Sequence, residues 1–135
     1  MITKYQADRE NSILFGRRNT EVHKNFYIAL SSTTINENGT GLTEPTDRNY
    51  SRILIPNDEF NFTISSNGIV KNITTWEFNI STKVWENPTT HWAIMDSLKG
   101  GRILYYDELP SPMSVDVNQV VHFNPEAIQL KRSGV

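Results

Sequence analysis

Short apolar runs separated by turn residues fill the chain from Asn25 onward. Runs of four to eight residues rich in β-branched and aromatic side chains alternate with segments of Gly, Asn, Pro, Ser and Thr. This spacing predicts an all-β fold, a jelly-roll-like antiparallel β-sandwich of eight or nine strands. The predicted strands are 26–31, 50–56, 60–65, 69–80 with room for a kink, 91–96, 102–109, 113–117, 120–123 and 127–131.

Alternation within two of these runs predicts which side chains are buried. In 73–80, the side chains of Trp76, Phe78 and Ile80 share one face and should be core, because successive strand residues point to opposite faces. The run 102–107 is apolar without alternation. Both of its faces should therefore be covered, either by sheet packing or by a neighbouring subunit.

Turn residues mark the connections between the strands. Asn67-Gly68 and Gly100-Gly101 suit the positive φ of tight turns, and the triplet 116–118 suggests a further tight turn. Pro110 and Pro112 lack the amide proton of a sheet ladder and predict a connection. The polar segment 34–49 is long for a loop, and such loops usually either serve a contact or stay mobile.

Only the N-terminus has a helical pattern. Thr3 can cap the first turn, and Gly16 suits the C-terminal end of a short helix. A charged connector at 17–19 follows, after which the pattern changes to that of strands. We therefore predict an N-terminal helix and connector arm at 1–24 and a β-sandwich domain at 25–135.

Composition narrows the classes of partner. The 135 residues carry a formal net charge of −2, a pI of about 5.9 and a mean hydropathy of −0.47, yet 10% are aromatic, which favours a folded chain. With no positive field to attract phosphates, nucleic acid is not an expected partner. The chain has no cysteine, no signal-peptide pattern and no apolar run long enough for a bilayer, so no membrane association is expected.

Residue patterns for catalysis or metal binding are lacking. His23, His91 and His122 are far apart and fit no metal-ligand spacing. The adjacent carboxylates at 58–59 and 107–108 would point to opposite faces of a strand, and Gly39-Thr40-Gly41 lacks the Lys of a phosphate-binding loop. We predict no catalytic residues, no metal and no cofactor, and therefore not an enzyme.

Several motifs in a fixed order carry a family resemblance. They are YIALSST at 27–33, NGTGLTEP at 38–45, YSR at 50–52, WEF at 76–78, THWAIMD at 90–96 and GGRILYYDEL at 100–109. In their order and spacing they resemble a family of small virion proteins of tailed bacteriophages, usually described as tail or tail-fibre proteins. The resemblance extends over most of the chain.

The resemblance implies a structural role in the virion, reached by assembly in the host cytoplasm. It points first to the tail, at the tip, the baseplate or a fibre attachment, where repeated copies or a homo-oligomer would contact other virion proteins. A head decoration or head-fibre protein is the alternative. A carbohydrate-binding module that recognises a host surface glycan is an alternative of another class.

Seven residues are candidates for contacts with a neighbouring subunit or a glycan. Asn38, Thr40, Leu42 and Glu44 lie in the long polar loop. Trp85, Trp92 and Tyr106 could offer aromatic rings to sugars, although aromatic side chains at strand spacing more often belong to a core or a subunit interface.

Overall fold

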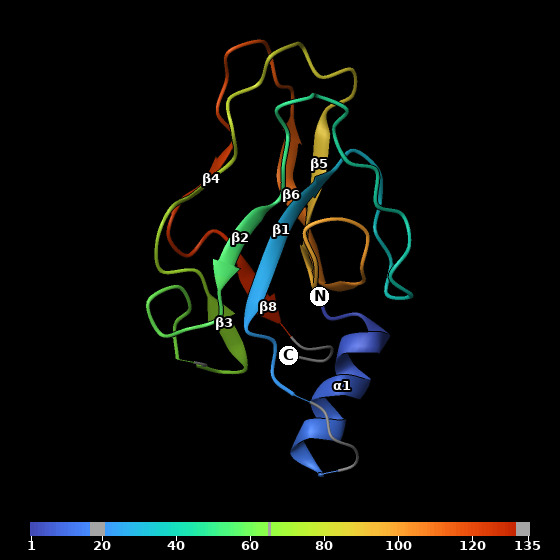
Figure 1. Ribbon diagram of the computed structural model, residues 1–135, viewed down its shortest axis with the longest axis vertical. Coiled ribbons are helices and arrows are strands. Elements are labelled where there is room, and N and C mark those ends of the chain that lie inside the picture. The colour runs from blue at the N-terminus through green and yellow to red at the C-terminus, as the bar shows by residue number, and fades with distance from the viewer. Residues whose placement is uncertain (17–20, 65, 132–135) are drawn as a thin grey trace.

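The fold is mainly antiparallel β-structure with one short N-terminal helix, as predicted from the sequence (Figure 1). The computed structural model describes residues 1–16, 21–64 and 66–131. Its elements are α1 (Lys4–Leu14), β1 (Asn25–Ser31), β2 (Ile53–Pro56), β3 (Ile69–Lys71), β4 (Trp76–Glu77), β5 (Thr89–Met95), β6 (Ile103–Met113), β7 (His122–Phe123) and β8 (Gln129–Lys131).

Four strands form the main sheet, in the order β2-β1-β5-β6, and every neighbouring pair is antiparallel. The other strands among the described residues pair as two small two-stranded ribbons, β3-β8 and β4-β7. In Figure 1, β3 and β4 lie on the β2 side of the view, whereas β8 lies near β1, and β8 contacts β6. The strands of these ribbons are two or three residues long, so the ribbons are less regular than the main sheet.

The main sheet is buried on both faces, by two separate hydrophobic clusters. The first core contains large side chains, among them Leu30, Trp76, Trp92 and Ile94. The members of the second core are Ala29, Ile35, Ala93, Met95, Ile103 and Tyr106, with Leu42 packed against them. The prediction that 102–107 is covered on both faces is confirmed, because Leu104 lies in the first core and Tyr106 in the second.

The N-terminal segment is attached to β6. Thr3 is the N-cap of α1, where its hydroxyl accepts a hydrogen bond from the Gln6 amide, as predicted. The same buried hydroxyl donates to the Ile103 carbonyl at 2.7 Å, and Ile2 forms a bridge with Tyr105. The division into an arm at 1–24 and a sandwich at 25–135 stays a prediction, and the predicted connector at 17–19 lies outside the described residues.

The predicted strand at 60–65 is wrong for its described part. The Asp58 carboxylate accepts hydrogen bonds from the amides of Phe60 and Asn61, which fixes a turn instead of a strand. Only Phe62 forms a bridge, with Asn72. Ser65 lies outside the described residues.

The predicted strand at 69–80 is divided by a buried asparagine. The Asn72 side chain donates to the carbonyls of Thr74 and Asn124 and accepts from the Ile128 amide. In the segment that connects β3 to β4, these side-chain hydrogen bonds replace the backbone hydrogen bonds of a strand. Trp76 and Phe78 are core residues as predicted. Ile80 is exposed, contrary to the prediction, because the regular strand has already ended at Glu77.

Two prolines were wrongly predicted to end the pairing. β6 continues through Pro110 and Pro112 to Met113, which pairs with Thr89. This is tolerated because β6 is an edge strand of the main sheet, where an absent amide proton costs no ladder bond. The predicted strand at 113–117 is consequently wrong beyond Met113.

The predicted tight turns are present. Asn67, Gly68, Gly100, Gly101 and Asn118 all have positive φ angles. Among the described residues, no helix has the length and apolar character to cross a membrane.

Candidate functional site: the anchored loop

The long polar segment 34–49, here called the anchored loop, covers one face of the main sheet. At its base the Ser32 amide donates to the Thr43 carbonyl, and the Thr43 amide donates to the Ser31 hydroxyl, each at 3.0 Å. Ile35 is buried in the second core and Leu42 packs against it. The loop thus acts as a structural layer over the small side chains of β1 and β5.

Gly41 lets the two arms of the loop approach each other. Its φ is +100°, and a Cβ at this position would lie 2.0 Å from the Thr34 carbonyl oxygen. Backbone cannot move aside as the end of a flexible side chain can. Gly39 also has a positive φ, but nothing lies within 4 Å of a Cβ there. Gly41 therefore meets two constraints and Gly39 only one.

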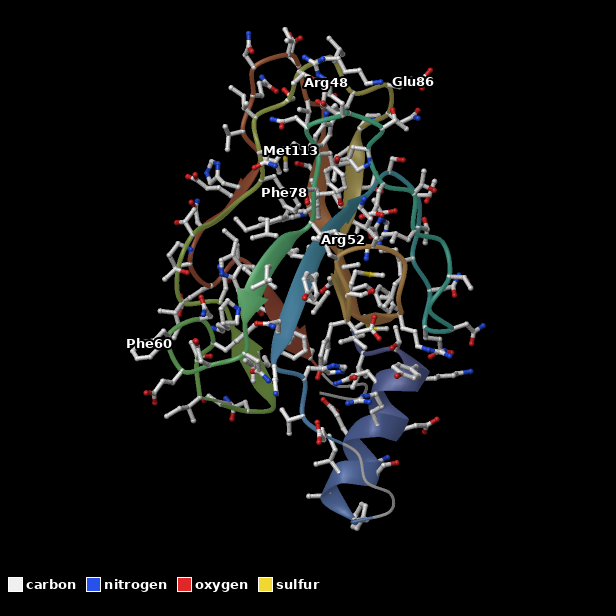
Figure 2. The ribbon with its side chains drawn as sticks, in the orientation of Figure 1. Arg48, Arg52, Phe60, Phe78, Glu86 and Met113 are labelled. Carbon is white, nitrogen blue, oxygen red and sulfur yellow. The ribbon has the colours of Figure 1, made fainter. Side chains whose placement is uncertain are left out.

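A partly buried ion pair joins the loop to two other parts of the chain. Arg52 donates to Glu44 through Nε at 2.8 Å and Nη2 at 3.0 Å, a bidentate pair. Its Nη1 donates to the carbonyls of Ser97 and Gly100, each at 2.7 Å. The guanidinium, near the centre of Figure 2, therefore connects the loop, the start of β2 and the turn between β5 and β6.

Tyr50 completes this group, which we call the Arg52 clamp and define as Glu44, Tyr50 and Arg52. The Tyr50 hydroxyl donates to Glu44 Oε1 at 2.8 Å and accepts from the Leu30 amide at 3.1 Å. Its ring stacks on Phe78. Burial, with the Glu44 charge as a smaller cause, raises the pKa of Tyr50, so the hydroxyl stays protonated and keeps its donor role.

Asp47 anchors the C-terminal end of the loop. Its carboxylate accepts from the hydroxyl and the amide of Thr82, from the Asn49 amide and from Trp85 Nε1. These hydrogen bonds, the Thr82 hydroxyl first, hold the pKa of Asp47 below its usual range. At neutral pH the carboxylate is ionised and ties the loop to the segment before β5.

The tip of the loop is a small closed turn that reaches α1. The Asn36 amide donates to the Thr40 carbonyl, the Gly39 amide donates to the Asn36 carbonyl, and the Thr40 hydroxyl donates to Asn36 Oδ1. The Lys4 amide also donates to the Glu37 carbonyl at 3.0 Å. Polar groups at this tip are thus held in fixed positions next to the helix.

The structure separates the seven predicted contact residues into two groups. Asn38 and Thr40 are exposed at the tip, Leu42 is half-buried under the loop, and Glu44 is held in the clamp. Trp85, Trp92 and Tyr106 are buried core side chains. These three rings therefore do not form an exposed platform for sugars, and contact of any of the seven with a subunit or a glycan stays a prediction.

Sequence reasoning did not find Asp47, Tyr50 and Arg52 as anchors. Tyr50 and Arg52 are two of the three letters of the YSR motif, which marked them only as a pattern. Their chemistry becomes visible when Glu44, eight residues before Arg52, is placed beside them. The sequence signal that could have indicated this ion pair is an arginine directly before an apolar strand, Arg52, with an acidic residue in the preceding loop, Glu44.

No group of three or more metal-ligating side chains occurs among the described residues. His91 is buried, with Nδ1 at 2.8 Å from the Thr90 hydroxyl, and His122 is exposed. Burial lowers the pKa of His23, with the Arg9 charge as a smaller cause.

Comparison with known protein families identifies the family of the chain. The model of the family described as podophage GP4 fiber I protein gp80 matches residues 2–131, which include all of the anchored loop and the Arg52 clamp. The chain belongs to this fibre protein family. No curated protein matches the chain.

Membership in the fibre family confirms the predicted resemblance to phage virion proteins. The chain is accordingly a component of the bacteriophage virion, of the fibre class. The match includes α1 and the small ribbons as well as the main sheet, because it begins at residue 2 and ends at residue 131.

Proposed function

We propose that the chain is a non-enzymatic building block of a phage fibre, attached to the tail and present in several copies. Membership in the fibre family is the observation that carries this proposal. The tail is preferred over the head because the sequence motifs resemble tail and tail-fibre proteins. Repeated copies are expected because virion fibres are built by symmetric association of identical subunits.

In this proposal the tip of the anchored loop contacts the neighbouring subunit. The exposed Asn38 and Thr40 offer hydrogen-bond donors and acceptors beside α1. Leu42 and Glu44 hold the tip in place through the second core and the Arg52 clamp. A surface that is already ordered loses little entropy on binding, so a fixed tip suits repeated assembly.

The same idea assigns Trp85, Trp92 and Tyr106 a supporting role. Trp85 holds Asp47 near the C-terminal end of the loop, and Tyr106 packs with Ile35 and Leu42 in the second core. Substitution of these rings would then affect assembly through folding, whereas substitution of Asn38 or Thr40 would affect assembly in a chain that still folds.

The position and copy number of the chain in the intact particle test the proposal. Cryo-electron microscopy of the virion should show several copies in a fibre or its tail attachment, with 36–40 within contact distance of a neighbour. An N38A/T40A chain should fold but assemble poorly. Density confined to the head, or normal assembly of that variant, would contradict the proposed placement or the proposed contact, respectively.

A further inference from the structure

The main sheet has two edges, and the edge formed by β6 is the longer one. β6 is eleven residues long, whereas β2 at the other edge has four residues and ends at Pro56. An edge strand presents backbone amides and carbonyls that can pair with a strand of another chain. Because a longer edge offers more such groups, β6 is the edge that matters most for contacts between copies.

The N-terminal segment covers the first half of the β6 edge. The Tyr106 amide donates to the Met1 carbonyl, and the Thr3 amide donates to the Leu104 carbonyl, each at 2.9 Å. The hydrogen-bonding groups of successive strand residues point alternately to the two sides of the strand. Those of Glu108 therefore point to the same side as those of Tyr106, where no strand of the described chain lies beside them.

Extra residues interrupt the uncovered half of this edge. From His91 to Thr89 the pairing advances by two residues along β5. Over the same interval it advances by five residues along β6, from Glu108 to Met113. Three residues of β6 in this interval therefore have no counterpart on β5, and the strand forms a large bulge.

Pro110-Ser111-Pro112 account for these extra residues. Leu109 still follows the alternation of the strand, since it lies in the first core with Tyr105. The three residues after it are exposed, and Figure 2 shows Met113, the last residue of β6, well away from α1. Without residues 110–112, Leu109 and Met113 would be neighbours in one regular ladder with β5.

The uncovered half of the edge lacks donors that a partner strand would need. Pro110 and Pro112 have no amide proton. The Glu108 amide donates to Asp107 Oδ1 at 2.8 Å, so its proton is already used. A strand laid along this bulged edge would leave some of its own carbonyls without donors, which costs free energy.

We propose that Pro110-Ser111-Pro112 is an edge guard, which prevents a second copy of the chain from pairing with β6. Copies of the chain then meet through other surfaces, and the main sheet does not continue from one copy into the next. The edge guard is a property of the chain itself and does not depend on the place of the chain in the virion.

Deletion of residues 110–112 tests the edge guard. The deletion removes both prolines and restores a regular register, so two copies can pair edge to edge about a two-fold axis. Sedimentation velocity over a range of protein concentrations should then show species of about twice the mass that the unmodified chain has at the same concentrations. Circular dichroism shows whether the deletion variant keeps its β-structure.

Two further variants show whether the new association uses the β6 edge. S111T changes the edge guard but keeps both prolines, and it should sediment like the unmodified chain. In the deletion variant, E108P removes the amide at the outward position and should return the mass to that of the unmodified chain. This proline breaks no bond between β6 and β5, because the Glu108 amide is bonded to Asp107.

The outcomes that overturn the edge guard are defined for each variant. A folded deletion variant that sediments like the unmodified chain overturns it. Association that persists after E108P also overturns it, because the contact then lies elsewhere on the surface. If the deletion variant does not fold, P110T/P112T decides, since it restores two amides at unchanged length. Equal sedimentation of P110T/P112T and S111T then overturns the edge guard.

Discussion

The two faces of the main sheet are buried by different means. The first core fills one face with large side chains such as Leu30 and Ile94, contributed mainly by strands. The other face carries Ala29 and Ala93, both fully buried, and is covered by the anchored loop. Stability on the first face depends on side-chain volume. On the second face it depends on small residues, a glycine and polar anchors that hold a loop in place.

Removal of volume from the first core should have the largest effect. Leu30 is fully buried in the central strand β1, so L30A should lower the free energy of unfolding by about 3–4 kcal/mol through lost burial and a cavity. The same change at Leu54 of β2, which is 50% exposed, should cost less than about 1 kcal/mol. Urea unfolding measures both, and equal losses would contradict the assignment of the core.

Loss of the Arg52 clamp should cause the second-largest loss of stability. R52A leaves Glu44 and the carbonyls of Ser97 and Gly100 without their shared donor, and we expect a loss of about 3 kcal/mol. R48A removes an exposed arginine from the same loop and should change stability by less than about 0.5 kcal/mol. Thermal unfolding of the two variants compares them directly, and a stable R52A protein would refute the clamp.

Replacement of the two loop glycines by alanine should cost different amounts of stability. G41A combines a positive φ with a contact to the Thr34 carbonyl and should cost about 2 kcal/mol. G39A meets only the backbone penalty and should cost about 1 kcal/mol. Chemical denaturation that ranks them in the opposite order would show that the loop does not close in this way.

Extra volume under the loop should have a smaller effect than L30A, R52A or G41A. A93L inserts three carbon atoms between β5 and the loop and should cost about 1–2 kcal/mol, since the loop must lift to accept them. A127L, at an exposed site, should be neutral within about 0.5 kcal/mol. If A93L is as stable as A127L by urea unfolding, the loop does not pack on the second face.

Local features of the fold could be predicted from the sequence. The Thr3 cap and the positive φ angles of Asn67, Gly68 and Gly100 depend on neighbouring residues alone. Asn72 could not be recognised as a strand breaker, because its partner Ile128 lies 56 residues away. The prolines of β6 were misjudged because the position of a strand at a sheet edge is a property of the whole fold.

The candidate site was also predicted only in part, because some of its features depend on neighbouring residues and others on distant ones. The long loop and its exposed Asn38 and Thr40 follow from local polarity and turn chemistry. Sequence could not show that Glu44 is neutralised by Arg52, or that Trp85 and Trp92 lie inside, because alternation does not tell which face of a strand is covered. A tryptophan has the same pattern in a core as in a binding surface.

Hydrogen exchange of the folded chain tests the anchored loop most directly. Residue-resolved exchange by NMR should show that the amides of Ser32 and Thr43, both hydrogen-bonded across the base of the loop, exchange as slowly as those of β1 and β5. In R52A, the amides of Ser32 and Thr43 should exchange faster than in the unmodified chain, and they should lose protection before those of β1 and β5. Exchange of the two amides at the rate of an unstructured peptide in the unmodified chain would contradict a loop fixed on the sheet.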